Sequence, residues 1–471
     1  MRLRLKRSVL PALLCLWSGV AACAEPDPFD TEADLPLKPA LRLGGAVGDP
    51  CAAAIPDHAL DLTEVVNLAL CSNPQTREVW ASARVNAAQL GASKGSYLPG
   101  LNLSASGNRN SPGVRQRSIG LTLSYLLYDF GARAANLENA RQLFLAATAT
   151  QDATVQSLFL TAVQGYYQTL ATQTALDAAR ESERAAQHSF AAAEARYLAG
   201  SATPADKLQA QTAWSQATLN RIGAEGTLKK AQGSLANILG LEANRRLALA
   251  PANTETVPED FERDVNALIV EAKRRRPDLI AAEAQVKAAE ASAEAARAAR
   301  LPTISLSAST TQLNTAGVNS HGSSLGVSVN VPLFAGFSPT YRVRAAEAQV
   351  EAQQARMEQI SLQVALDVWN AWQNLVTATQ SLRTTADLLH SAEQSERVAL
   401  GRYEAGVGNM LDVLNAQSAL ASARQQRIQS QLDWNVSRAA LAQAIGGLDE
   451  DLLLTLSPAG QKKYPPKESP R

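Results

Sequence analysis

The sequence has 471 residues, of which 5% are aromatic and 19% are charged, and alanine fills long stretches of it. Much alanine with few aromatic residues favours extended packing of helices over a compact globule with an aromatic core. The 44 basic and 44 acidic residues balance, so no basic face for nucleic acid is indicated.

The N-terminus has the pattern of an export signal. Basic residues up to Arg7 precede an apolar run from Val9 to Val20, which small residues follow. A membrane-spanning helix needs about 20 apolar residues, and no segment of the chain reaches that length, so helical membrane spans are excluded. We interpret residues 1–24 as a signal peptide. Cleavage within Ala22–Ala24 and acylation of Cys23 as a lipoprotein both fit, and the sequence leaves both open.

Two cysteines, Cys51 and Cys71, remain when the signal is removed and Cys23 is cleaved off or acylated. An even pair in an oxidising compartment predicts a disulfide bond. Closing a loop of this size would stabilise the fold by roughly 3 kcal/mol and tie an N-terminal extension, residues 25–60, to the first helix. The alternative is a pair of unbonded, buried thiols.

The same sequence pattern occurs twice, about 203 to 206 residues apart. Ala195–Gly200 (ARYLAG) returns as Gly401–Gly406 (GRYEAG), and Tyr97–Ser106 (YLPGLNLSAS) returns as Arg300–Ser309 (RLPTISLSAS). The change of offset indicates a longer loop in one copy. We therefore divide the chain into a first repeat, a second repeat and a C-terminal tail predicted to be disordered, which are residues 61–260, 261–447 and 448–471.

Each repeat contains two segments that alternate between apolar and small or polar residues, which is the period of a half-buried strand. They predict one β-hairpin over about residues 101–128 and another over about 303–333. Polar segments rich in turn-forming residues, 107–117 and 311–323, are expected to be the turns.

A long run without proline follows each predicted hairpin, Arg133–Leu198 in the first repeat and Tyr341–Glu404 in the second. Each run predicts a helix of roughly 100 Å at about 1.5 Å per residue. A glycine turn and a returning helix follow each of them, so long helical hairpins are expected over about 131–240 and 338–445. Helices of this length need neighbours for support.

The returning helices begin with recognisable caps. Thr203 is expected as the N-cap of the first, with Asp206 at the third helical position, and Asn409 and Asp412 hold the same places in the second. A carboxylate at the third position is favoured by the helix dipole whatever the function, so this structural role is an alternative to any functional one.

The four predicted strands form a sheet whose one face is apolar, although the chain has few aromatic residues to cover it. This face is expected to meet lipid and the opposite face water. An open sheet in a membrane leaves backbone groups at its edges unsatisfied, so the sheet must close. Four strands are too few, and closure requires two, three or four chains. The fold class is thus a mixed α and β membrane protein.

From about Leu60 onward the chain resembles the TolC family of outer-membrane efflux proteins. The resemblance rests on the duplicated Leu-Pro before the strands, on Tyr128–Gly131 (YDFG) and Leu333–Gly336 (LFAG), and on the two Arg-Tyr-x-x-Gly turns. It implies a homotrimer in the outer membrane of a Gram-negative bacterium. Its twelve-stranded transmembrane β-barrel, with four strands per chain, would continue into a long α-helical periplasmic barrel.

The resemblance also implies a periplasmic gate that a periplasmic adaptor protein opens, and an inner-membrane ABC exporter or proton-driven pump that supplies energy. Tyr403 matches the gating tyrosine, Asp412 the constriction aspartate and Asp206 the aspartate that bonds across hairpins. Gly408 stands where some members have a gating arginine, and Asn415 where they have a second aspartate ring. The gate is expected to be looser and less acidic than theirs. Tyr403 also has the simpler interpretation of a residue that packs between helices.

The helix tips are expected to contact the adaptor through residues of the two glycine turns, which are Gly200, Thr203, Gly406 and Asn409.

No catalytic constellation is present in the sequence. The four histidines, His58, His188, His321 and His390, are far apart and show no metal-ligand spacing. We therefore expect a transport function, without a cofactor, a metal or enzymatic activity.

The segment Asn73–Arg77 (NPQTR) resembles family members that serve type I secretion of protein toxins such as haemolysin or adenylate cyclase toxin. Drug or metal efflux with a proton-driven pump is the alternative, and acylation of Cys23 would favour it. A purely structural periplasmic coiled coil would use the long helices but would not need the strands.

Overall fold

The computed structural model describes residues 27–33, 35, 58–110, 113–245, 247–251 and 264–447. The predicted signal peptide with Cys23, the C-terminal tail, and most of the N-terminal extension, including Cys51, lie outside these residues. Cys71 takes part in a disulfide bond, and its pairing with Cys51 stays a prediction.

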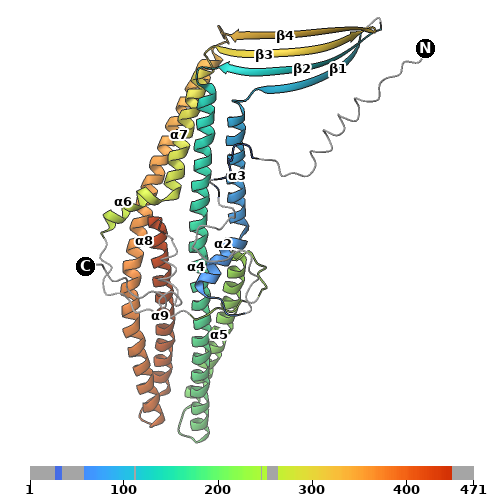
Figure 1. Cartoon of the computed structure of the whole chain (residues 1–471). Coiled ribbons are helices and arrows are strands. Elements are labelled where there is room, and N and C mark those ends of the chain that lie inside the picture. The colour runs from blue at the N-terminus through green and yellow to red at the C-terminus, as the bar shows by residue number, and fades with distance from the viewer. Residues whose placement is uncertain are drawn as a thin grey trace, which may run out of the picture. The chain divides into compact units, whose positions relative to one another are not determined.

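Two helices, two strands, a long helix and a returning helix follow one another in the described chain, and the same order then occurs again (Figure 1). The helices are α2 (Leu62–Ser72), α3 (Pro74–Gly95), α4 (Ala132–Leu198), α5 (Pro204–Ile238), α6 (Val265–Arg275), α7 (Pro277–Ala298), α8 (Ser338–Glu404) and α9 (Met410–Ile445). Among the described residues, none of these helices is both long and apolar enough to cross a bilayer.

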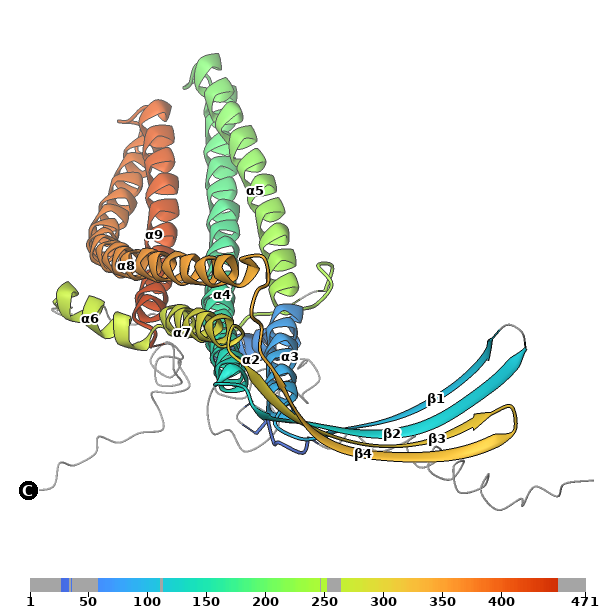
Figure 2. The ribbon, with the colours of Figure 1, turned by 90° about the horizontal axis from the view of Figure 1, so that it is seen from above.

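One compact unit holds the strands and the adjoining helix ends, residues 27–33, 35, 84–144 and 291–344 among those described. Its strands are β1 (Gly100–Asn110), β2 (Val114–Tyr128), β3 (Thr303–Thr315) and β4 (Val318–Asn330). They form one antiparallel sheet in the order β1-β2-β3-β4 and curve side by side (Figure 2). In the single chain, β1 and β4 are the edges of this sheet.

The register places apolar side chains on one face of the sheet. Leu103 pairs with Leu121, and Ala308 pairs with Leu325, all four on the same face. The opposite face carries serines whose hydroxyl groups hydrogen-bond across the strands at 2.7 and 2.8 Å, in the pairs Ser106–Ser118, Ser305–Ser328 and Ser309–Ser324. Leu325 is 77% exposed, so the apolar face is uncovered in the single chain.

The expected turns at 107–117 and 311–323 were wrong, because the strands extend through most of these residues. Gly107 pairs with Arg117 in the first hairpin, and Thr311 pairs with Gly322 in the second. The second turn consists of Ala316 and Gly317, both at positive φ, as in a two-residue hairpin turn. The residues at the hairpin ends are polar and have the composition of a loop. A strand that extends beyond the apolar band does not need to alternate between apolar and polar residues, so its sequence carries no strand pattern there.

Aromatic residues gather where the strands join the helices. The rings of Tyr128 and Phe130 meet edge to face at 4.7 Å, and those of Phe334 and Phe337 at 5.5 Å. All four side chains are exposed. Aromatic rings in such a position are typical of a membrane interface.

The second compact unit holds the helices, residues 58–83, 145–290 and 345–447 among those described. The two expected long helices are confirmed, and both end at the predicted residues, Leu198 and Glu404. A returning helix runs beside each of them (Figure 1). Lys207 on α5 pairs with Glu194 on α4 at 2.9 Å, and Thr385 on α8 hydrogen-bonds Ser430 on α9 at 2.7 Å.

Two apolar cores support these hairpins. The short helix α2 packs on α4 and α5 around Phe159, and α6 packs on α8 and α9 around Trp434. The residues that α8 contributes to the second core are spaced by alternating steps of four and three residues, as in a coiled coil, and they are Val364, Val368, Ala371, Leu375, Ala378 and Leu382. Burial raises the pKa of the Tyr166 phenol, which stays protonated and donates a hydrogen bond to the backbone oxygen of Ala250 at 2.9 Å.

A glycine at the end of each returning helix lies against the end of a short helix, at corresponding places in the two halves. Gly240, after α5, has φ +70°, and a Cβ there would lie 2.5 Å from the backbone oxygen of Ser72. Gly446, after α9, has φ +79°, and a Cβ there would lie 3.1 Å from the backbone carbon of Arg275. Since α2 ends at Ser72 and α6 at Arg275, both halves make the same close approach between helix ends.

Candidate functional site

The first hairpin tip is held by local caps. Gly200 closes α4 at φ +71°, and Thr203 begins α5 in a capping box with Asp206. The Asp206 carboxylate accepts hydrogen bonds from the backbone N and the hydroxyl of Thr203 at 2.9 and 2.8 Å. Within the described chain, the hydrogen bonds of this carboxylate stay in its own hairpin. The cap positions expected from the sequence are confirmed.

The second tip is built like the first, with the same backbone hydrogen bonds after its long helix. Gly406 follows α8 at φ +80°, and the Asn409 side chain accepts a hydrogen bond from the backbone N of Asp412 at 2.7 Å. A Cβ at Gly408 would lie 3.0 Å from the backbone N of Tyr403. An arginine at this position would therefore require the turn to shift. Asp412 and Asn415 are both exposed, three residues apart on one side of α9.

The two tips meet through Arg196 of α4 and Tyr403 of α8. The Arg196 guanidinium lies over the Tyr403 ring, 4.6 Å from its centroid. Tyr403 is 5% exposed and packs in a small core with Ala193, Met410 and Val413. Among the described residues, its hydroxyl group has no hydrogen-bond partner. The ring, not the hydroxyl, therefore makes the contact between hairpins in the single chain.

Polar contacts continue this interface along α4 and α9. Gln417 Nε2 donates to the Ser189 hydroxyl oxygen at 3.0 Å, and Arg424 pairs with Glu181 at 3.0 Å. Gln417 and Arg424 stand seven residues apart, so they lie on one stripe of α9. With Arg196 and Tyr403 they form three successive contacts between the hairpins, which we call the hairpin latch.

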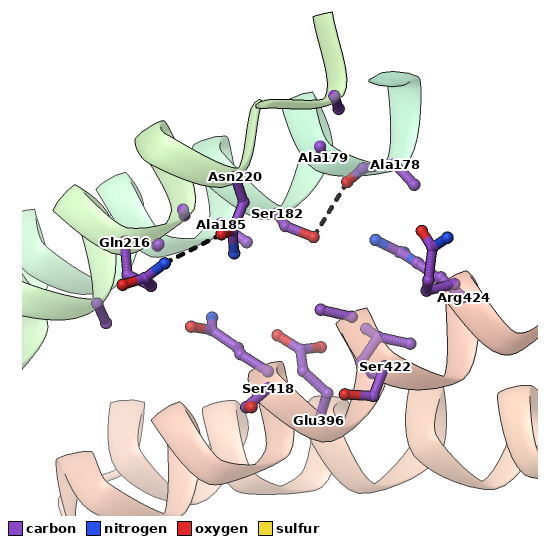
Figure 3. A pocket seen from close by; sticks show the side chains of 18 of the residues that line it. Ala178, Ala179, Ser182, Ala185, Gln216, Asn220, Glu396, Ser418, Ser422 and Arg424 are labelled. Carbon is purple, nitrogen blue, oxygen red and sulfur yellow. Dashed lines mark hydrogen bonds between the residues drawn. The ribbon is translucent and has the colours of Figure 1, made fainter. Parts of the chain in front are cut away.

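An open groove of about 700 Å³ lies between the two hairpins beside the hairpin latch. Ala178, Ser182 and Asn220 of the first hairpin face Ser418 and Ser422 of the second across this groove (Figure 3). Small side chains on both walls leave room for another helix to approach closely. Glu396 of α8 and Arg424 also line the groove.

The sequence indicates Tyr403 as a candidate gate residue but gives no signal for its partner Arg196. The spacing of Gln417 and Arg424 places them on one side of α9, but no local pattern indicates which residues of α4 they contact. In the part of the chain that the structure describes, no group of three or more His, Cys, Asp or Glu residues could hold a metal ion.

The segment Asn73–Arg77 lies at the junction of α2 and α3. Asn73 Nδ2 donates to the backbone oxygen of Ile238 at 2.9 Å, and Asn73 Oδ1 accepts from the backbone N of Gln75 at 2.8 Å. The buried Thr76 hydroxyl donates to the backbone oxygens of Leu70 and Asn73. These residues stabilise the connection between α2 and α3 and its contact with the end of α5.

The family model described as "Outer membrane efflux protein" matches residues 65–241 and 268–447. The chain belongs to the TolC family of outer membrane efflux proteins. The protein CyaE of Bordetella pertussis is 31% identical to it over 462 residues, which cover 92% of this chain and 94% of that protein. The outer membrane protein TolC of Escherichia coli is 24% identical, with 86% of each chain covered.

A crystal structure of a membrane protein from Pseudomonas aeruginosa is similar in fold, with a TM-score of 0.74 at 26% identity. It covers 82% of this chain and 93% of that one. As a TolC-family protein, the chain is an outer membrane efflux channel that extends into the periplasm. The family consists of channel and transport proteins and is not an enzyme family.

Proposed function

We propose that three copies of the chain form one passive exit duct, in which a twelve-stranded barrel in the outer membrane continues into a tunnel of long helices in the periplasm. The observation that carries the proposal is the four-stranded sheet with one exposed apolar face, one serine-lined face and two free edges. The apolar face meets lipid and the serine-lined face meets water. The twofold sequence repeat supplies one hairpin from each half.

Closure of the sheet requires neighbouring chains. Unpaired backbone groups on β1 and β4 would each cost several kcal/mol in lipid, and pairing β1 of one chain with β4 of the next removes them. Barrels in membranes begin at about eight strands, which excludes one chain. Three chains is the number that the TolC family implies.

The mass and the conductance of the purified protein test the duct. In detergent, the mature protein should have three times the mass of one chain, and it should form ion-conducting channels in planar lipid bilayers. A monomer that leaves such bilayers without current would refute the proposal.

The hairpin tips form the periplasmic gate in this proposal. Three copies of Asp412 on the exposed side of α9 would form a ring of like charges near the axis, which attracts cations. Asn415 would add a polar, uncharged ring. The hairpin latch holds the hairpins of each chain together, in place of the gating arginine that Gly408 cannot supply. Asp206 serves as a cap in its own hairpin and is available to a neighbouring chain.

Replacing Asp412 by Asn tests the ring of charges. Block of the single-channel current by a multivalent cation should weaken, because the ring loses its negative charge. Asn415→Ala is the matched control, since it alters a neighbouring uncharged position on the same side of α9. Equal block in wild type and Asp412→Asn would place this carboxylate outside the conducting path.

The tip turns are the contact for a periplasmic adaptor protein, and an inner-membrane pump supplies the energy. Gly200 and Thr203 belong to one turn, and Gly406 and Asn409 to the other. Cysteines introduced at Thr203 and Asn409 should cross-link to the adaptor in the assembled system. A cysteine at the exposed Thr174, in the middle of α4, should not.

We favour type I secretion of a protein toxin as the transport process, with an ABC exporter as the pump. The 31% identity with CyaE over nearly the whole chain supports this more than Asn73–Arg77, whose residues have structural roles at the junction of α2 and α3. Drug or metal efflux with a proton-driven pump is the alternative, and the description of the family as efflux proteins supports it.

The phenotype of a strain that lacks the protein distinguishes the two transport processes. Loss of one large protein from the culture supernatant, with unchanged sensitivity to antibiotics and metals, is expected for type I secretion. Unchanged secreted protein with raised sensitivity would instead identify the alternative.

A further inference from the structure

Three arginines are the only charged residues, histidine aside, in the strand segments 100–128 and 303–331. Arg109 stands on β1, and Arg115 and Arg117 stand on β2, all at the end of the first hairpin. These segments contain no Asp or Glu. The hairpin end is therefore strongly basic and carries no acidic side chain of its own.

The register fixes the face on which the arginines lie. Pairing of β1 with β2 is continuous from Gly100 to Asn110, so side chains alternate strictly along both strands. Arg109 pairs with Arg115, and Gly107 pairs with Arg117, on the face that also carries Leu103 and Leu121. The arginines thus continue the apolar face and not the serine-lined face. This position argues against a role in the lumen.

The arginines begin where the apolar band ends. Ile119 is the last large apolar side chain of β2 on this face, and Arg117 is the next residue on the same side. On β3, Gln312 pairs with Ile119 and Asn314 pairs with Arg117, so this face of the neighbouring strand is already polar beside Ile119 and stays polar beside Arg117. Arg115, Arg117 and Asn314 also line a hollow of about 490 Å³ between the two hairpin ends.

Like charges placed directly opposite each other on neighbouring strands destabilise a sheet. The Arg109–Arg115 pair has this arrangement, and the three side chains are exposed. An anion bound between them would remove the repulsion, and guanidinium groups match phosphate oxygens in bidentate geometry. A phosphate group at the height of the membrane surface, outside the lipid-facing band, has the required charge and place.

We propose that Arg109, Arg115 and Arg117, the basic cluster, bind the phosphate groups of lipid A, the phosphorylated glycolipid of the outer leaflet. The basic cluster lies at the outer interface, because the strands join the helices at their other end, where the aromatic residues gather. Each chain is anchored by aromatic rings on the periplasmic side and by arginine–phosphate contacts on the outer side. The inference rests on the proposed membrane placement of the sheet.

Binding of bisphosphorylated lipid A to the detergent-solubilised full-length protein tests the proposal. The triple variant Arg109→Gln/Arg115→Gln/Arg117→Gln should bind it more weakly than wild type by a factor on the order of 100, since each arginine at a membrane surface contributes about 1 kcal/mol. The control variant Arg274→Gln/Arg356→Gln/Arg397→Gln removes the same charge from exposed helix positions and should bind like wild type. The triple lysine variant of the basic cluster keeps the charge and should retain most of the binding.

Each other outcome overturns the proposal. Equal binding of lipid A by wild type and the glutamine variant would show that the cluster does not hold it. Equal binding of dephosphorylated lipid A, or full competition by inorganic phosphate at the same concentration, would exclude a lipid phosphate as the ligand. A changed anion-to-cation permeability ratio with unchanged lipid A binding would place the arginines in the lumen. Wild-type protein that conducts but binds no lipid A would refute this inference alone, whereas failure to conduct would refute the duct.

Discussion

In the proposed gate, the contact between Arg196 and Tyr403 takes the place of a contact made by a side chain at position 408. Gly408 offers no side chain, and a Cβ there would lie 3.0 Å from the backbone N of Tyr403. The positive charge at the tip comes instead from α4, where the Arg196 guanidinium lies over the Tyr403 ring. Cation–π contacts contribute about 0.5–2 kcal/mol, depending on exposure. This energy is small enough for a docking partner to overcome.

Substitutions at Tyr403 distinguish the contribution of its ring from that of its hydroxyl group. Tyr403→Leu and Arg196→Gln should each raise the mean single-channel conductance, because losing about 1 kcal/mol per chain shifts the closed-to-open ratio about fivefold per subunit. Tyr403→Phe is the matched control and should behave like wild type, because the hydroxyl has no partner among the described residues. Conductance that rises as much in the Phe variant as in the Leu variant would show that the hydroxyl bonds a neighbouring chain and that the ring contact is secondary.

At the scale of elements, the junctions between short and returning helices place strict demands on the backbone. Gly240 combines a φ of +70° with a Cβ position 2.5 Å from the backbone oxygen of Ser72. Both features exclude a side chain unless α2 moves away from α5. Gly223, within α5, has no atom near its Cβ position.

Alanine substitutions at these two glycines should act in opposite directions. Gly240→Ala should destabilise the protein by at least about 2 kcal/mol, from the left-handed backbone and the overlap with Ser72. Gly223→Ala should stabilise it by about 0.5–1 kcal/mol, because alanine favours a helix interior. Thermal unfolding followed by circular dichroism at 222 nm gives the two shifts in apparent Tm. A Tm for Gly240→Ala at or above that for Gly223→Ala would contradict the proposed close approach.

Sequence signals that act over a few residues predicted their elements well. Thr203 and Asp206 stand three residues apart and take the predicted cap positions, where they form a capping box. The strand ends were predicted wrongly, because the residues around Arg115 and Thr311 are polar like a loop although they pair in the sheet. The hairpin latch could not be predicted, since Gln417 and Ser189 are 228 residues apart and meet only through tertiary packing.

At the scale of the whole molecule, the faces of the sheet relate each chain to its surroundings. Apolar side chains such as Leu325 and Val327 are uncovered on one face, and the other face is lined by hydrogen-bonded serines. A water-soluble protein rarely exposes a contiguous apolar patch of this kind. In the proposed duct, lipid covers the first face and a water-filled lumen lies against the second. The membrane and the neighbouring chains would then complete the sheet that one chain leaves open.

Adjacent residues of β4 allow the two faces to be tested with the same substitution. Leu325 lies on the apolar face, and Gly326, the next residue, lies on the opposite face with no atom near its Cβ position. Leu325→Arg should cost about 2–4 kcal/mol if the side chain points into the bilayer, and it should reduce the amount of trimer in the outer membrane. Gly326→Arg should assemble normally and lower the conductance for cations, because it adds a positive charge to the lumen. Trimer yield from purified outer membranes and single-channel recordings measure the two effects. Normal assembly of Leu325→Arg together with loss of trimer for Gly326→Arg would mean that the serine-lined face meets lipid, and the proposed orientation of the sheet would have to be reversed.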